Sequence, residues 1–140
     1  MPMPTPRNAQ QGVMLLEALI GLLIFSIGIL ALLAMQATSM RVTVDAKYRS
    51  EASFLVNEIV GVMWSNPADL TAFSTANCES TPTCDAWRSR VIELLPNAAT
   101  NVPTIDVAGR QVTVTVFWQR PGEPNVSNHQ LVAQIARAED

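Results

Sequence analysis

The fold of this chain is decided by the stretch QQGVMLLEALIGLLIFSIGILALLAMQ, residues Gln10–Gln36. Between Val13 and Met35 its only strongly polar side chains are those of Glu17 and Ser26. About twenty such residues in a helix match the roughly 30 Å hydrocarbon core of a bilayer. The stretch therefore predicts a helix that is inserted in a membrane.

One acid, Glu17, lies inside this apolar run. An ionised carboxylate in hydrocarbon is costly, so an acid at membrane depth is a hypothesis for a functional site whose partner has to be found. Ser26 needs no such explanation, because a serine hydroxyl can bond to a carbonyl of the preceding helical turn.

Length and charge limit what the rest of the chain can do. The 140 residues leave room for one small head beyond the apolar run. The net charge is -3, and no basic cluster is present. Proteins bind the phosphate backbone of nucleic acids mainly through Lys and Arg, so we expect no nucleic acid partner.

The chain begins with a short polar leader, residues 1–12. Three prolines between Met1 and Gln11 argue against a regular helix there, and the leader ends at Gly12, directly before the apolar run. If a peptidase cleaves the chain, it removes this leader and retains the apolar helix.

A single long helix is predicted for residues 13–65, with 13–36 as its membrane part. No helix breaker occurs before Asn66-Pro67, which ends it. Beyond Gln36 the apolar residues contract to a stripe with helical spacing, which predicts packing against the head, residues 66–140. The stripe consists of Ala37, Met40, Val44, Tyr48, Ala52, Leu55, Ile59 and Met63.

Two glycines, Gly21 and Gly28, are seven residues apart and so lie on nearly one helix face. Small residues in a membrane helix let a second helix approach closely. The alternative is that glycine is simply more frequent in membrane helices.

The head contains both cysteines, Cys78 and Cys84, with five residues between them. In an oxidising compartment this pair predicts a disulfide, whereas in the cytosol the same residues would be free thiols. The spacing is not that of a zinc ligand pair, and His129 is the only histidine, so we expect no metal.

The remaining patterns predict an α+β head. CDAWRSRVIELL, Cys84–Leu95, spaces Trp87, Val91 and Leu94 as an amphipathic helix, with Thr83 as candidate N-cap. Residues 104–107 and 111–119 flank Ala108-Gly109 and predict a hairpin. In VTVTVFW, residues 112–118, apolar side chains alternate as in a half-buried strand. Residues 128–136 suit a third strand better than a helix, because a lone hairpin is marginal.

The run GVMLLEALIGLLIFSIGILALLAMQ resembles the N-terminus of a type IV prepilin. Prepilins have a short polar leader that ends in glycine, here Gly12, and a peptidase cleaves after it and methylates the new first residue, here Val13. A glutamate stands at the fifth mature position, here Glu17. The S-I-G run from Ser26, VNEIVGVMWSNPADL from Val56 and VTVTVFW resemble PilV-type minor pilins, also called type IV pilus modification proteins.

This resemblance implies a pilin-like α+β fold, in which a long N-terminal helix packs on a small antiparallel sheet. It implies insertion in the inner membrane with the N-terminus cytoplasmic and the head periplasmic, followed by incorporation into a pilus on the cell surface. The implied partners are the lipid bilayer, prepilin peptidase, the inner-membrane assembly platform, and other major and minor pilins. No cofactor is implied.

The resemblance also implies a partner for Glu17. Cleavage would create an amine at Val13, about 6 Å from Glu17 along the helix axis. In the filament, Glu17 of one subunit is expected to pair with this amine on another. The alternative is that Glu17 lies near the membrane interface and reaches the headgroups.

Two other readings remain open: a minor pseudopilin of a type II secretion system, and an unprocessed single-span protein whose periplasmic head binds a ligand. An enzyme is not expected, because no catalytic set of side chains occurs at a usable spacing. Asp85, Glu93 and Asp106 are interpreted as solvated charges.

Overall fold

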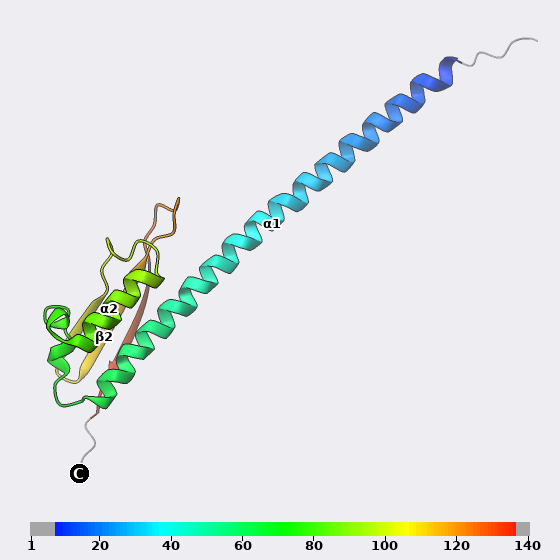
Figure 1. Cartoon of the computed structure of the whole chain (residues 1–140). Helices are drawn as coiled ribbons and strands as arrows, with labels where there is room; N and C mark the ends of the chain where they lie inside the picture. Colours follow the sequence, from blue (N-terminus) through cyan, green and yellow to red (C-terminus); the bar gives the residue numbers. More distant parts are fainter. Residues whose placement is uncertain (1–7, 137–140) are drawn as a thin grey trace, which may run out of the picture. The chain divides into compact units, whose positions relative to one another are not determined.

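The computed structural model describes residues 8–136, with side chains from Gly12 onward. Most of the predicted leader, residues 1–7, lies outside the described residues. The chain divides into two compact units, Met1–Val44 and Asp45–Asp140. The elements follow in the order α1, α2, β1, β2, β3, which confirms the predicted α+β class with a long N-terminal helix and a small antiparallel sheet (Figure 1).

Helix α1, Asn8–Ser65, contains 58 residues. It ends as predicted: the Asn66 amide donates to the Met63 carbonyl in a last tight turn, and Pro67 follows. Its start was predicted at Val13, and the helix begins earlier, at Asn8. The reason is that the last proline of the leader is Pro6, so no residue after it prevents a helix.

In the N-terminal unit, every residue from Gly12 to Val44 is exposed. This part of α1 is long and apolar enough to cross a membrane. A helix that is apolar on all sides is stable only within lipid or within a bundle of other helices. The predicted single membrane-spanning segment therefore agrees with the observed helix in length and composition.

In the second unit, the predicted apolar stripe of α1 is buried from Tyr48 onward. Ala52, Leu55, Ile59 and Met63 are completely buried, and Tyr48 is half-buried. The first three residues of the stripe, at positions 37, 40 and 44, are exposed, so that part of the prediction was wrong. These residues belong to the N-terminal unit, where no other described element covers them.

The connection after α1 contains two short 3₁₀ helices, Leu70–Phe73 and Cys78–Ser80. Leu70 and Phe73 dock into the core, whereas Trp64 remains about half exposed. Helix α2, Pro82–Leu94, starts one residue before the predicted cap at Thr83. Proline favours the first helical position, and Thr81 precedes it. The Thr81 hydroxyl does not cap the helix but donates to the Ala72 carbonyl, at 2.8 Å.

The buried face of α2 consists of Cys84, Trp87, Val91 and, just after the helix, Leu95. Leu94, which was predicted to be buried, is exposed. The spacing of three, four and four residues from Cys84 to Leu95 follows one helix face, and Leu94 lies to the side of it.

The sheet has the order β1-β2-β3 and is antiparallel throughout. Its strands are β1, Thr104–Ala108; β2, Gln111–Trp118; and β3, Ser127–Gln134, so the predicted third strand is confirmed. Ala108 pairs with Gln111, which places the hairpin turn at Gly109-Arg110, one residue later than predicted. Gly109 has a φ of 64°, a conformation that favours glycine.

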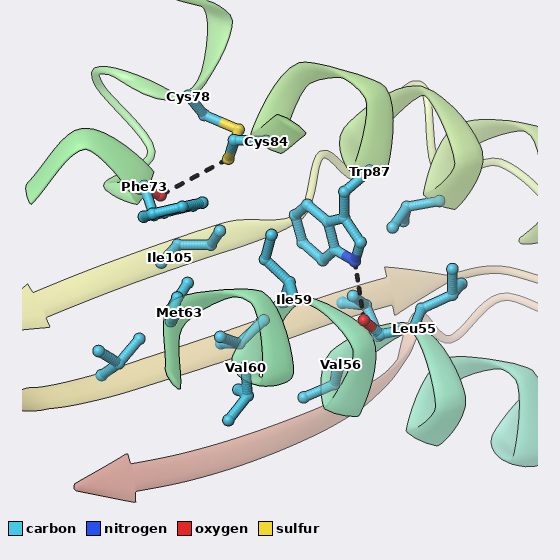
Figure 2. Packing of buried hydrophobic residues seen from close by; sticks show 14 of the residues in the cluster. Leu55, Val56, Ile59, Val60, Met63, Phe73, Cys78, Cys84, Trp87 and Ile105 are labelled. Atoms are coloured by element: carbon cyan, nitrogen blue, oxygen red, sulfur yellow. Dashed lines mark hydrogen bonds between the residues drawn. A yellow bond between two sulfur atoms is a disulfide. The ribbon is translucent and has the colours of Figure 1, made fainter. Parts of the chain in front are cut away.

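The core of the head lies between one face of the sheet and two helices, α2 and the C-terminal part of α1. The alternation in β2 is confirmed, because Val112, Val114, Val116 and Trp118 are all completely buried. Trp87 of α2 lies against α1, and its indole N–H donates to the Leu55 carbonyl at 2.8 Å (Figure 2). This bond fixes α2 on α1 across a buried contact.

We predict that Trp87→Phe lowers the free energy of unfolding of the head by about 1–2 kcal/mol, because the aromatic volume is largely kept while a buried hydrogen bond is lost. Urea denaturation of the chain in detergent, followed by near-UV circular dichroism, measures this. Trp64→Phe is the matched control, since Trp64 is about half exposed. Equal stability of the Trp87 variant and the unmodified chain would contradict the assigned role of the bond.

Candidate assembly site on the N-terminal helix

Glu17 lies on the exposed surface of α1 among apolar neighbours. Val13, Leu16 and Ile20, which flank it on the helix, are each about half exposed or more. Within residues 8–136, the Glu17 carboxylate makes no hydrogen bond or ion pair. The acid is thus presented on an apolar surface, and any group that pairs with it has to come from outside the described part of the chain.

The candidate site residues share one face of α1. At about 100° per residue, Val13, Glu17, Gly21 and Gly28 fall within a sector of about 80°. Ser26 lies about 180° from the centre of this sector. The assembly face, as we call the surface of Val13, Glu17, Gly21 and Gly28, therefore combines the acid, the two small residues and the predicted new N-terminus.

The glycines of the assembly face are not required by the chain itself. A Cβ atom placed on Gly21 or Gly28 meets no other atom of the chain within 4 Å. Both residues lie in regular helix, where glycine is less favourable than alanine by about 1 kcal/mol. Any requirement for glycine at these positions comes from contact with another molecule.

Gly12 and Val13, the predicted cleavage junction, lie within helical backbone in the first turns of α1. A peptidase needs locally extended backbone, so cleavage requires the segment Asn8–Gly12 to unwind. The first turns of a helix open most easily, because their N–H groups lack intrahelical partners.

Ser26, on the opposite face, donates its hydroxyl to the Leu22 carbonyl at 2.7 Å, as expected. Thr38 and Thr43 bond to the preceding turn in the same way. These hydroxyls are satisfied within the helix, so the apolar stretch contains one polar side chain without a partner in the described chain, that of Glu17.

The second candidate feature, the cysteine pair, forms a disulfide between Cys78 and Cys84. Both residues are almost completely buried in the head core (Figure 2). The Cys84 sulfur lies 3.7 Å from the Phe73 carbonyl oxygen; because a bonded sulfur has no proton, this is a packing contact. The disulfide joins the second 3₁₀ helix to α2 and is a structural element of the head.

The other charged residues belong to the surface of the head. Asp85, Glu93 and Asp106 are exposed, as predicted. His129 lies half-buried in β3, opposite Val116. Among the described residues, no group of three or more His, Cys, Asp and Glu side chains is placed to hold a metal ion.

The ion pairs between elements could not be predicted from the sequence. Arg90 of α2 pairs with Glu58 of α1 at 2.6 Å, and Arg120 lies 3.9 Å from Asp45 and 3.5 Å from Glu123. The partners in the Arg90–Glu58 and Arg120–Asp45 pairs are far apart along the chain, and no local pattern indicates them, whereas Glu123 follows Arg120 by three residues. They bind the head together at its surface, where such pairs contribute little individually.

Comparison of the chain with protein-family models, with curated proteins and with solved structures found no match. A function therefore has to be inferred from the geometry of the assembly face and of the head.

We predict that Gly28→Ala leaves the isolated chain folded and equally stable or more stable, but weakens its association with other helices. Circular dichroism of the chain in detergent measures the first effect, and resonance energy transfer between labelled copies in lipid vesicles measures the second. Gly61→Ala is the matched control, since Gly61 also lies in α1 and has no neighbouring atom within 4 Å. Equal association of both variants would show that the small residue on the assembly face has no role in helix packing.

Proposed function

We propose that this chain is a minor pilin, a non-catalytic structural subunit of a type IV pilus. It is inserted in the inner membrane through α1 with its head in the periplasm. Prepilin peptidase removes the leader after Gly12 and methylates Val13. The processed subunit then joins major and minor pilins through the inner-membrane assembly platform.

The observation that carries this proposal is the placement of Glu17. Its carboxylate is exposed on an apolar helix face, has no partner in residues 8–136, and lies one turn below Val13. A purely anchoring helix gains nothing from a charge at this position. A subunit that must bind one neighbour in one axial register does gain from such a charge.

The mechanism is electrostatic selection within an apolar bundle. An unpaired charge buried among helices destabilises the assembly by several kcal/mol, whereas a paired one is tolerated. Glu17 of an incoming subunit pairs with the Val13 amine of a neighbour, because this amine is at the same end of the helix. The axial offset that joins the two charges is thereby favoured over all others.

The apolar surface of α1 supplies the affinity once this register is set. In the bilayer, contacts between apolar helices are little better than contacts with lipid tails. In a filament outside the membrane, the same surface would face water unless it is buried. Burial stabilises by about 25 cal/mol per Å² of apolar area. The exposed residues that contribute include Leu19, Leu22, Leu23, Ile27 and Leu30.

The disulfide of the head supports the proposed orientation. Disulfides persist in the periplasm and are rare in the cytosol. The Cys78–Cys84 bond is therefore consistent with a head outside the cytoplasm.

A minor pseudopilin of a type II secretion system shares the logic of the N-terminal helix and is the second candidate. An unprocessed, anchored binding protein is the third. The anchored protein would retain its leader, and the pseudopilin would be absent from sheared pili. The experiments below therefore separate the three candidate functions.

The first test is the mass of the N-terminus. We predict that the chain purified from sheared pili begins with methylated Val13, as read by N-terminal peptide mass spectrometry. Retention of Met1 would reject processing and favour the anchored protein. A methylated Val13 in the membrane fraction, together with its absence from purified pili, would favour the pseudopilin.

The second test concerns Glu17. We predict that Glu17→Ala enters the membrane normally but is incorporated into filaments about tenfold less or worse, because the partner amine is left unpaired. Quantitative immunoblotting of membrane and sheared-filament fractions measures both. Ser26→Ala, on the opposite helix face, is the control and should be incorporated normally. Normal incorporation of the Glu17 variant would reject the pairing mechanism.

A further inference from the structure

The two edges of the sheet differ in the way their backbone groups are used. At the β1 edge, the Ile105 amide donates to the Thr75 hydroxyl at 2.7 Å, and the Thr75 amide donates to the Ile105 carbonyl at 2.9 Å. Strand β1 has only five residues and follows Pro103. The connection before α2 thus covers this edge at Ile105.

The backbone groups at the β3 edge can be assigned from the register. Because Ile105 bonds outward to Thr75, its neighbours in β1 bond to β2, and the alternate residues of β2 bond to β3. Val114 therefore exchanges hydrogen bonds with Leu131, and Val116 with His129. The N–H and C=O groups of the other β3 residues point away from the sheet. These edge residues are Asn128, Gln130, Val132 and Gln134.

No hydrogen bond within residues 8–136 engages these outward groups. All eight residues of β3 pair with β2 without a bulge. Proteins normally protect such an edge with a charge, a proline, a bulge or a covering segment. From Val126 to Ala136 the sequence has no Asp, Glu, Lys, Arg, Pro or Gly. Within the part of the chain that the structure describes, the β3 edge is thus long, regular and unprotected.

The side chains next to this edge indicate what would cover it. Leu131 and Ala133 are half-buried and pack against the core from the helix-covered face of the sheet. Asn128, Gln130 and Gln134 are exposed on the opposite face. An added strand would continue both faces, so it needs apolar residues at alternate positions toward Leu131 and Ala133 and polar residues between them.

We propose that the β3 edge binds an extended strand of a different protein by β-strand addition. The occupant is a segment in which apolar and polar residues alternate. Its backbone pairs with the outward groups of the edge residues, and its apolar side chains close the core beside Leu131 and Ala133. This inference needs neither processing of the leader nor a filament.

A second copy of the chain is a poorer occupant. In an antiparallel two-fold pair of β3 strands, the axis is perpendicular to the sheet, so the α1 segments on the two sheets run in opposite directions. If two copies are anchored in one bilayer by residues 13–35, their α1 helices lead into the two heads in the same direction, which this antiparallel pair does not allow. This argument rests on membrane insertion, and self-pairing is therefore an outcome that the experiment must detect.

The probe is the peptide acetyl-KTVTVTVK-amide, which alternates threonine and valine. Amide hydrogen exchange of the full chain in detergent is followed by nuclear magnetic resonance, with and without peptide. We expect exchange at the four edge residues to slow at least about tenfold at saturating peptide, because formation of a strand pair protects these amides. The same peptide N-methylated at its threonines cannot donate its hydrogen bonds and should give no protection.

Two variants at one position test the edge directly. Val132→Pro removes one outward N–H and should weaken peptide binding about tenfold, whereas Val132→Thr retains the amide and the branched shape and should bind normally. Protection of the Val114 and Val116 amides, which bond to β3, reports whether the proline variant keeps its sheet. If it loses the sheet, the N-methylated peptide remains the deciding comparison.

Three results would overturn the proposal. Unchanged exchange at the edge residues would show that no strand binds there. Equal protection by the N-methylated peptide would show binding by another mode. Concentration-dependent protection without peptide would identify a second copy as the occupant. None of these results bears on cleavage after Gly12 or on Glu17, so they leave the proposed pilin function untouched.

Discussion

The burial of one stripe of α1, from Ala52 to Met63, is the constraint on which the head depends. The sheet has three strands and α2 has thirteen residues, so neither buries enough apolar area to be stable alone. The stripe of α1 provides the surface on which both pack, and the Trp87 bond to the Leu55 carbonyl fixes the position of α2 on it. The disulfide then closes the connection at the N-terminal end of α2, within the core.

In the N-terminal unit, the apolar residues of the same helix are distributed differently. From Val13 to Met35 it is apolar on every side, and within that stretch the one polar side chain without a partner in the described part of the chain is that of Glu17. Packing inside the head is directional, because only one stripe is covered. Packing of the membrane stretch has no preferred side or register by hydrophobicity alone, since all faces are alike. A single charge in this stretch can define both a preferred side and a preferred register.

The sheet edges add a second source of specificity. At the β1 edge, the outward backbone groups of Ile105 bond to Thr75 and are thus used within the chain. Strand β3 offers four residues whose backbone groups point outward, next to half-buried Leu131 and Ala133. The two proposed modes of association, helix contacts and strand addition, use separate parts of the chain and are therefore independent of each other.

Much of the fold could be predicted from local pattern. The end of α1 at Ser65 follows from Asn66-Pro67, and the buried face of β2 follows from strict alternation in VTVTVFW. The two errors in α2 concerned positions where two local signals compete. Thr83 is a good cap by residue type, but Pro82 sets the start of α2; Leu94 has helical spacing, but Leu95 continues the face that begins at Cys84. The apolar stripe of α1 also extends toward the N-terminus to Ala37, beyond the residues that other described elements cover.

The sequence by itself determined the apolar helix, the acid within it, the shared face of Val13, Glu17, Gly21 and Gly28, and the class of the head, because each follows from spacing along one element. Only the tertiary structure decided that Trp87 bonds to Leu55, that Thr75 covers β1, and that β3 remains open. These contacts join residues that are distant in the chain. Their geometry depends on how the elements pack, and no local periodicity contains that information.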